Sequence, residues 1–253
     1  MNAVLEVRGL SKAFGGVHAV EDLGFDLRAG ERLALIGPNG AGKSTSFQML
    51  MGELRPDAGT ACFEGVDLVG MEPREIWALG VGRTFQITSV FASMTVAENV
   101  QTALQARNGQ SFDPFRRARA LHRDEAISLL ERVGMAEQAD RPASVLAYGD
   151  VKRLEFAIAL AGEPRLLLMD EPTAGMAPRE RHALMDLVSG IVAERGISVL
   201  FTEHDMDVVF GHADRIMVLD RGRLIADGTP DAVRADAKVR SVYLGSGAET
   251  GHA

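Results

Sequence analysis

Hydrophobic positions along this chain follow two spacings, one typical of strands and one typical of helices. Residues 4–8 alternate, with Leu5 and Val7 on one side, which is the pattern of a half-exposed strand. Residues 166–169 form a continuous apolar run, as expected of a parallel strand that is covered on both faces. Further short strands are predicted at residues 25–27, 32–36, 60–63, 197–201, 216–219 and 223–226, the last two joined as a hairpin through Arg221 and Gly222.

Between residue 88 and about residue 145 the apolar positions take a helical spacing instead. This block is rich in Ala, Leu and Arg, and one predicted helix face carries Ala126, Leu129, Leu130 and Val133. Strand–helix alternation returns from residue 150. There, Pro178 begins a helix whose predicted buried stripe includes Leu184, Leu187, Val188 and Ile191. The pattern predicts an α/β fold with a helical insertion.

Composition narrows the possible functions. The 253 residues are 46% hydrophobic, enough for one substantial core or two smaller ones. With 27 basic and 35 acidic residues the net charge is −8, which argues against a nucleic-acid-binding surface over the whole chain. The single cysteine, Cys62, precludes an internal disulfide and suits a reducing cytosol. No apolar run reaches the roughly 18 residues of a membrane span, and the N-terminus lacks signal-peptide features, so we expect a soluble chain whose membrane role goes through partners.

Residues 37–45 read GPNGAGKST and fit the pattern G-x-x-x-x-G-K-[ST] of a phosphate-binding loop. Its glycines let the backbone turn tightly, so that successive N–H groups converge on a phosphate. Lys43 offers a positive charge to the β- and γ-phosphates, and Ser44 offers a hydroxyl to Mg²⁺. The loop joins the strand predicted at 32–36 to a helix predicted at 44–51, whose N-terminal end favours anions. We therefore expect the chain to bind a nucleoside triphosphate.

Two acidic residues follow the apolar run at 166–169. Asp170 stands at the carboxyl end of a predicted strand, where doubly wound sheets hold ligands, and is a candidate to hold Mg²⁺ through its water shell. Glu171 is a candidate to polarise the water that attacks the γ-phosphate. Alone, such a pair more often caps a turn. Beside a phosphate-binding loop, the catalytic interpretation is favoured.

Three further residues have both a functional and a structural interpretation. His204 follows another predicted strand, where it either donates to γ-phosphate oxygens or makes an ordinary loop hydrogen bond. Gln86 lies where the core passes into the helical block; its side-chain oxygen suits Mg²⁺ or water, although a surface amide is the plainer interpretation. Phe14, upstream of the phosphate-binding loop, either stacks on a nucleobase or packs in the core, and the sequence alone favours the core.

In this order the motifs resemble those of the nucleotide-binding subunits of ABC transporters, over nearly the whole chain. The matching stretches are GPNGAGKST, Gln86, LAYGD at 146–150, LLLMDEP ending at Pro172, AGM at 174–176 and His204. In that family they are called Walker A, Q-loop, signature, Walker B, D-loop and switch histidine. Phe14 matches the family's adenine-stacking position, so the resemblance favours stacking over core packing.

The resemblance implies a P-loop NTPase (RecA-like) core with an N-terminal antiparallel β subdomain and an inserted α-helical subdomain. We expect a single ABC ATPase domain over 1–253, with its nucleotide-binding core at 1–87 and 150–230, a helical and signature subdomain at 88–149, and a C-terminal helix and flexible tail at 231–253. The implied catalytic residues are Glu171, His204 and Gln86, and the implied Mg²⁺ ligands are Ser44, Gln86 and Asp170. ATP would be bound by Phe14, Gly37, Pro38, Asn39, Gly40, Ala41, Gly42, Lys43, Ser44 and Thr45 and, across a dimer, by Ala147, Tyr148 and Gly149.

The signature stretch departs from the LSGGQ usual in that family. Ala147 stands where a serine hydroxyl would bind the γ-phosphate held by a partner subunit, and its absence removes one charge-assisted hydrogen bond, roughly 1.5–3 kcal/mol. Gly149 and a helix N-terminus expected near Val151 still offer backbone N–H groups. Asp150 replaces a glutamine, and its carboxylate either repels the triphosphate or only caps the helix. We expect an intact Walker half and a weakened signature half, which suits a heterodimer.

Within the family, three regions resemble the ATPases of branched-chain amino-acid importers. They are GRTFQ with FASMTVAENV at 82–86 and 91–100, GTPDAV at 228–233, and VYLG at 242–245. ATPases of urea and short-amide importers share these features, so that substrate class stays open, as does weak turnover caused by the altered signature. The resemblance implies ATP and Mg²⁺ as cofactors and a place on the cytoplasmic face of the cell membrane. The implied partners are a second ATP-binding subunit (hetero- or homodimer), two transmembrane permease subunits and, indirectly, an extracytoplasmic solute-binding protein, with no nucleic acid.

Other classes of protein fit the sequence less well. A soluble ABC-type regulator or translation factor usually carries two cassettes, and only one fits here. A small GTPase or kinase would leave the signature stretch without a purpose, and no N-K-x-D-type motif is visible. A nucleotide-binding scaffold without turnover is suggested by Ala147 and Asp150, but the presence of Glu171 and His204 argues against it.

Overall fold

The computed structural model describes residues 3–84, 90–109 and 121–244. The chain divides into two compact units. The first unit comprises Met1–Ile76 and Ser198–Ala253, and the second comprises Trp77–Ile197. Gln86 and the tail after Leu244 lie outside the described residues, as does most of the arginine-rich stretch at 107–123. Within the described residues, no helix is both long and apolar enough to cross a bilayer.

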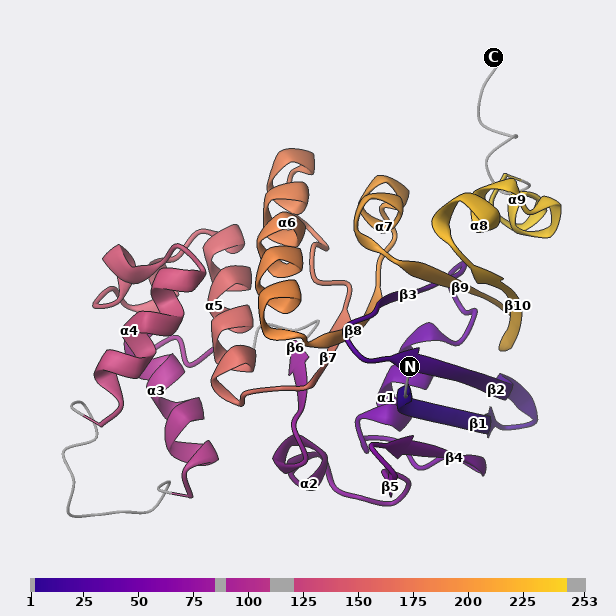
Figure 1. Cartoon of the computed structure of the whole chain (residues 1–253), viewed down its shortest axis with the longest axis horizontal. Helices are drawn as coiled ribbons and strands as arrows, with labels where there is room; N and C mark the ends of the chain where they lie inside the picture. Colours follow the sequence, from indigo (N-terminus) through magenta and orange to yellow (C-terminus); the bar gives the residue numbers. More distant parts are fainter. Residues whose placement is uncertain (1–2, 85–89, 110–120, 245–253) are drawn as a thin grey trace. The chain divides into compact units, whose positions relative to one another are not determined.

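An antiparallel sheet with the strand order β2-β1-β4-β5 opens the first unit (Figure 1). Its strands are β1 (Ala3–Phe14), β2 (Val17–Arg28), β4 (Ala58–Phe63) and β5 (Val66–Asp67). Phe14 pairs with Val17, so β1 and β2 are joined by Gly15 and Gly16 alone, with φ of 53° and 86°. Both angles suit the two-residue turn whose twist matches that of the strands. Alternation at residues 4–8 predicts only the start of β1, because the strand continues through register shifts near Leu10.

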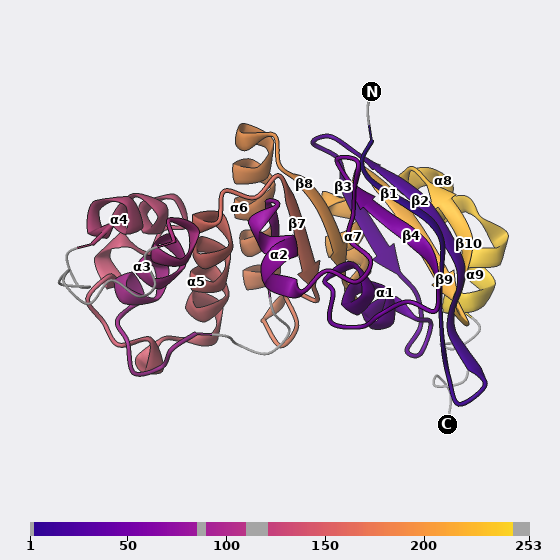
Figure 2. The ribbon, with the colours of Figure 1, turned by 90° about the horizontal axis from the view of Figure 1, so that it is seen from below.

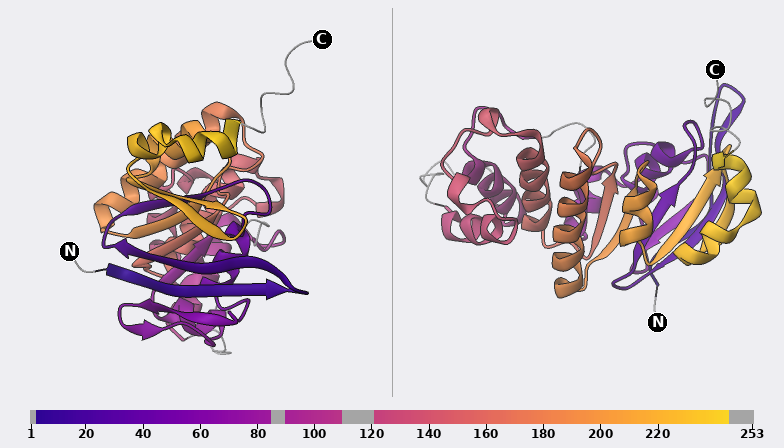
Figure 3. Two further views of the ribbon diagram at one scale, coloured as in Figure 1. Left: turned by 90° about the vertical axis from the view of Figure 1, so that its right-hand side faces the viewer. Right: turned by 90° about the horizontal axis from the view of Figure 1, so that it is seen from above.

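The first unit also holds strands in the order β10-β9-β3-β8. Strand β3 (Arg32–Ile36) is parallel to both β8 (Ser198–Thr202) and β9 (Arg215–Asp220), and β9 forms the predicted antiparallel hairpin with β10 (Arg223–Gly228). Every residue of β8 is buried, as expected of a parallel strand covered on both faces. The helices of this unit are α1 (Lys43–Leu50), α7 (Met206–His212), α8 (Pro230–Ala235) and α9 (Ala237–Leu244), of which α8 and α9 lie beside β10 (Figure 3).

The second unit combines two parallel strands with a group of helices. Strands β6 (Val81–Thr84) and β7 (Leu166–Asp170) pair in parallel, with Thr84 opposite Met169. Helix α2 (Pro73–Ala78) leads into this unit along the chain. Helices α3 (Val96–Arg107), α4 (Arg123–Arg132) and α5 (Tyr148–Ala161) pack together (Figure 2), short 3₁₀ turns at Ala136–Gln138 and Ala143–Val145 join α4 to α5, and α6 (Pro178–Arg195) packs on α5.

The predicted helix faces are confirmed. Ala126, Leu129, Leu130 and Val133 are all buried, and so are three of the four positions expected along α6, while Leu187 is half-buried. Helix α3 starts with a capping box: the Thr95 hydroxyl accepts from the Glu98 N–H, and the Glu98 carboxylate accepts from the Thr95 N–H. The helical spacing therefore identified a real core between α3, α4 and α5.

An ion pair fixes the start of β3, the strand that leads into the phosphate-binding loop. Asp214 Oδ1 accepts from Arg32 Nη2 at 2.6 Å, and Asp214 Oδ2 accepts from the Arg32 backbone N–H at 2.9 Å. Burial raises the pKa of the Asp214 carboxyl. The hydrogen bonds from the Arg32 side chain and backbone lower this pKa by more than burial raises it, so that it lies below its ordinary value. The ionised carboxylate is therefore the form that stabilises this end of the sheet.

The stabilisation by Asp214 should depend on pH. Because the folded-state pKa is depressed, the contribution is complete above the unfolded value of about 3.9 and is lost as the pH falls through the folded value. We expect Asp214→Asn to lower the free energy of unfolding at pH 7, and the difference from the parent to shrink below about pH 4. Chemical denaturation at several pH values measures this. Asp186→Asn, on the exposed side of α6, is the control, and an Asp214→Asn effect that is equal at pH 7 and pH 3 would contradict the assignment.

Candidate functional site

The phosphate-binding loop lies in the first unit, between the end of β3 and the start of α1. Helix α1 begins at Lys43, one residue before the predicted start, because Gly42 with φ of 104° serves as its N-cap. Asn39 and Gly40 are exposed, whereas Ala41 is only 2% exposed. The loop thus presents its middle to solvent and is anchored at both ends.

Two glycines of the loop are required by close contacts within the protein. A Cβ atom at Gly37 would lie 2.3 Å from the Leu219 carbonyl oxygen on β9, and one at Gly42 would lie 2.3 Å from the Ala19 carbonyl oxygen on β2. The loop is also held by hydrogen bonds, since the Gly222 N–H donates to the Ala41 carbonyl oxygen at 3.0 Å. The sequence predicted these glycines from phosphate binding alone, and the contacts with β2 and the β9–β10 turn add a structural requirement.

Lys43 is buried in the loop that it serves. The residue is only 6% exposed, and its Nζ donates to the Gly37 carbonyl oxygen at 2.6 Å and to the Pro38 carbonyl oxygen at 3.2 Å. The ammonium therefore lies against the backbone of the first two loop residues. In the first turn of α1, Ser44 is exposed and Thr45 is half-buried. A cation, two hydroxyls and a helix N-terminus are gathered within one turn of the chain, which is the arrangement that binds phosphate.

Phe14 is exposed and does not belong to the core. The residue is 51% exposed at the tip of the β1–β2 hairpin, and Lys12 Nζ lies 5.8 Å from the centre of its ring. Asp57 holds the neighbouring backbone by accepting from the Lys12 ammonium at 2.7 Å and from the Ala13 N–H at 2.8 Å. The structural interpretation favoured by sequence alone is therefore wrong, and the ring is available for stacking.

His204 lies at the same edge of the sheet as the phosphate-binding loop. It follows β8, which is the parallel neighbour of β3, so the carboxyl ends of both strands meet there. The histidine is exposed, and its backbone N–H donates to the carboxylate of buried Glu203 at 3.2 Å. Asp205 then caps α7 by accepting from the N–H groups of Asp207 and Val208.

The two predicted acids end β7 in the second unit. Asp170 is the last residue of the strand, one residue beyond the predicted end, and is 7% exposed. Glu171 follows with φ of 50°, a left-handed backbone conformation that is uncommon for a residue with a side chain. Such an outlier is a reason to look for function at that position. The turn after it is closed by the Ala174 N–H, which donates to the Glu171 carbonyl oxygen at 3.1 Å.

The signature stretch begins a helix earlier than predicted. Helix α5 starts at Tyr148 instead of near Val151, and Ala147 is its N-cap, with an extended backbone and no side-chain cap. Asp150 does not cap the helix either: its Oδ2 accepts from Gln138 Nε2 at 3.0 Å. The carboxylate is thus hydrogen-bonded to the 3₁₀ turn at Ala136–Gln138. Neither of the two alternatives drawn from the sequence anticipated this contact.

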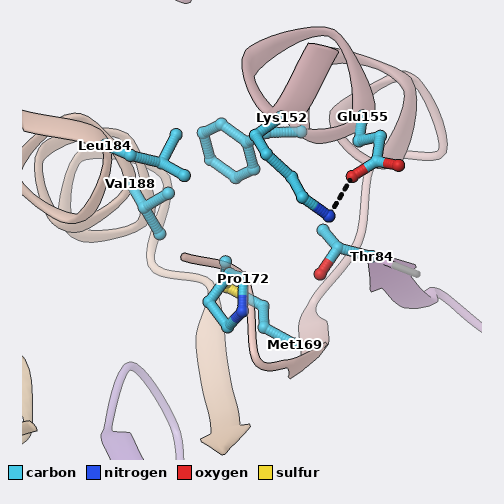
Figure 4. Close-up of a pocket in the computed structure, with 8 residues that line it drawn as sticks. Thr84, Lys152, Glu155, Met169, Pro172, Leu184 and Val188 are labelled. Atoms are coloured by element: carbon cyan, nitrogen blue, oxygen red, sulfur yellow. Dashed lines mark hydrogen bonds and ion pairs between the residues drawn. The ribbon is translucent and has the colours of Figure 1, made fainter. Parts of the chain in front are cut away.

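A small cavity lies beneath the signature helix in the second unit. Lys152 and Glu155 of α5 form an ion pair at 3.0 Å, with side chains only 4% and 5% exposed, and Figure 4 shows the ammonium pointing toward Thr84. Apart from that pair and Thr84, the lining is apolar and consists of Phe156, Met169, Pro172, Leu184 and Val188. Nothing in the sequence marked this pair, since a lysine and a glutamate three residues apart usually lie on a solvated helix face.

Comparison with known proteins decides the family. Residues 20–174 match the family model described as ABC transporter. The chain belongs to the ABC transporter family. Residues 223–249 of this ABC protein also match the model of the branched-chain amino acid ATP-binding cassette transporter.

Relatives match this ABC protein over nearly its whole length. The high-affinity branched-chain amino acid transport ATP-binding protein LivG of Salmonella typhimurium is 41% identical over 249 residues, which are 96% of this chain and 98% of LivG. The corresponding BraF protein of Pseudomonas aeruginosa is 37% identical with the same coverage. Among solved structures, the ADP conformation of an ATP-binding cassette of an ABC transporter aligns with a TM-score of 0.86 at 31% identity, covering 97% of this chain and all of that one. The predicted fold class, a P-loop NTPase, and the predicted ATP-binding, ATP-hydrolysing subunit of an ABC importer are confirmed.

The predicted site residues of this cassette are divided between the two units. Phe14, the phosphate-binding loop and His204 lie in the first unit, and Asp170, Glu171 and the signature residues lie in the second, while Gln86 is outside the described residues. Sequence reasoning missed Ala19 and Gly222, which support the loop, and the buried pair beneath α5. Only the Arg221-Gly222 turn had a sequence signal, as a hairpin, and its contact with Ala41 had none.

The N-cap position of α5 yields a test of the altered signature. In Ala147→Ser, the new hydroxyl can accept from the N–H of Gly149 or Asp150, and we expect the free energy of unfolding to rise by about 1 kcal/mol. Chemical denaturation measures this. The same change at Ala183, exposed within α6, is the control and should lose a few tenths of a kcal/mol.

A lack of stabilisation in Ala147→Ser would show that the serine does not cap α5. The same variant also tests the expectation of a weakened signature half. If parent and variant hydrolyse ATP at equal rates, the missing hydroxyl does not limit turnover.

Proposed function

We propose that this ABC cassette hydrolyses Mg²⁺-bound ATP to power the import of branched-chain amino acids through separate membrane subunits. The observation that carries the substrate class is the 41% identity to LivG, which extends over 96% of this chain and 98% of the relative. The match of residues 223–249 to the branched-chain amino acid cassette model supports it from the C-terminal end. The solute itself would be bound by partner proteins, not by this chain.

ATP binding rests on the first unit. The backbone N–H groups of the phosphate-binding loop and the buried Lys43 ammonium would bind the β- and γ-phosphates, and exposed Phe14 would stack on the base. His204, at the carboxyl end of the neighbouring strand, would donate to the γ-phosphate. These roles follow from position within one unit and from the chemistry of each group.

The residues proposed for Mg²⁺ suit that ion. Mg²⁺ prefers oxygen ligands, and Ser44 offers an exposed hydroxyl while Asp170 offers a carboxylate at the end of β7. Gln86 would add a side-chain oxygen. When bound, Mg²⁺ neutralises charge on the β- and γ-phosphates. Within the described residues, no three or more His, Cys, Asp or Glu side chains cluster as a protein-only metal site, so this ion would share its coordination with ATP and water.

Hydrolysis depends on Glu171. Its carboxylate would accept a proton from the attacking water, at a position that the unusual backbone of the residue defines. Closure would need a second cassette, identical or different, because residues 147–149 of one subunit would complete the site built on the phosphate-binding loop of the other. Two permease subunits would place the cassette at the cytoplasmic face of the membrane, and an extracytoplasmic binding protein would deliver the solute.

Two variants separate ATP binding from ATP hydrolysis. We expect Glu171→Gln to bind ATP normally and to lose turnover by about 10²-fold or more, because it removes the general base. Lys43→Ala should lose ATP binding itself. Phosphate release and titration with a fluorescent ATP analogue measure the two effects. Arg74→Ala, which removes a cation that is 81% exposed, is the matched control for Lys43. Unchanged phosphate release in Glu171→Gln would instead favour a scaffold without turnover.

Transport assays test the substrate class. In cells that lack this chain but contain its permeases, we expect uptake of radiolabelled leucine to be restored by the parent and not by Glu171→Gln. Urea and acetamide uptake are measured in parallel. Restoration of urea or amide uptake without leucine uptake would assign the cassette to the other importer class.

A further inference from the structure

The signature tyrosine is bonded to the turn that follows the catalytic glutamate. Tyr148, the first residue of α5, donates from its hydroxyl to the Ala174 carbonyl oxygen at 2.9 Å. A Cβ atom at Gly175 would lie 3.5 Å from the same ring, and Gly175 has φ of 79°. The ring therefore packs against the turn at Gly175, where the lack of a side chain leaves room for it.

Ala174 joins this tyrosine to Glu171. Its carbonyl oxygen accepts from Tyr148, and its N–H donates to the Glu171 carbonyl oxygen at 3.1 Å. Two hydrogen bonds thus connect a signature side chain to the backbone of the residue with the left-handed conformation. A shift of Tyr148 relative to the turn would break one bond and loosen the other.

Two further contacts keep Tyr148 in place. A Cβ atom at Gly149 would lie 3.6 Å from Met176 Cε, so the signature glycine packs on the same turn. Lys152, one helical turn along α5, holds Nζ 5.6 Å from the centre of the Tyr148 ring, and Glu155 holds that ammonium (Figure 4). The tyrosine is thereby supported from its own helix as well as from the turn.

We propose that Tyr148 is a positioning residue for Glu171, and that the signature and the 173–176 turn move as one piece. This inference rests on the proposed function, in which residues 147–149 contact the nucleotide held by a partner subunit. Engagement of that nucleotide would act on Tyr148, and through Ala174 on the orientation of Glu171.

The experiment removes only the hydroxyl. In Tyr148→Phe the ring and its packing remain, and the bond to Ala174 is lost. We expect kcat for ATP to fall by about three- to tenfold, equivalent to roughly 0.7–1.4 kcal/mol. KM should stay within about twofold, because the phosphate-binding loop and Phe14 lie in the first unit and the backbone N–H groups of residues 147–149 are kept. Amide hydrogen exchange in the full-length chain should become faster at Ala174 and Met176, whose N–H groups close the turn.

Two further variants sharpen the result. Gly175→Ala strains the same contact from the other side, and we expect the same fall in kcat at unchanged KM. Val145→Ala, three residues before Tyr148 and 55% exposed, is the control and should match the parent. Parent-like kcat and exchange in Tyr148→Phe would overturn the proposal. So would a fall in kcat with parent-like exchange, since the bond would then not order the turn.

Failure of the proposed function gives a different result. If the parent protein does not hydrolyse ATP, or hydrolyses it equally well without the Glu171 carboxylate, the proposed function fails. The exchange measurement does not depend on turnover, and it still decides whether Tyr148 holds the turn.

Discussion

The packing of the first unit depends on the close approach of the phosphate-binding loop to strands β2 and β9. Between β3 and α1 the backbone lies against carbonyl oxygens of β2 and β9, at a distance that any side chain on Gly37 or Gly42 would prevent. The same contacts bring together strands that are far apart in the sequence. Because the loop is fixed from two sides, its N–H groups and Lys43 are oriented by the fold. Phosphate recognition and packing therefore place the same demand on the same residues.

Much of the fold could be predicted because burial leaves a regular mark on the sequence. The apolar run before Asp170 and the helical spacing around Leu130 each reported a buried face, and both were right. Boundaries were less accurate, since they depend on caps and pairing. Helix α5 starts at Tyr148, where Ala147 has no capping side chain to announce it. Strand β1 extends to Phe14 through register shifts that interrupt the alternation.

Contacts between distant residues left no such mark. The exposure of Phe14 follows from the two-glycine turn that ends β1, and only the resemblance to a known family pointed to it. The bond from Tyr148 to Ala174 joins two motifs that the sequence presents separately. Asp150 was expected to repel the nucleotide or to cap the helix; it does not cap α5, and its carboxylate accepts from Gln138, a contact that the sequence did not indicate. Each of these depends on where a side chain ends in space, which spacing along the chain does not encode.

The buried pair beneath α5 has a consequence for how this lineage can vary. Losing either Lys152 or Glu155 alone would break a buried ion pair, which typically costs about 3–5 kcal/mol, whereas replacing both with apolar residues is often neutral. The two positions should co-vary among relatives, so that a chain with an apolar residue at one has lost the opposite charge at the other.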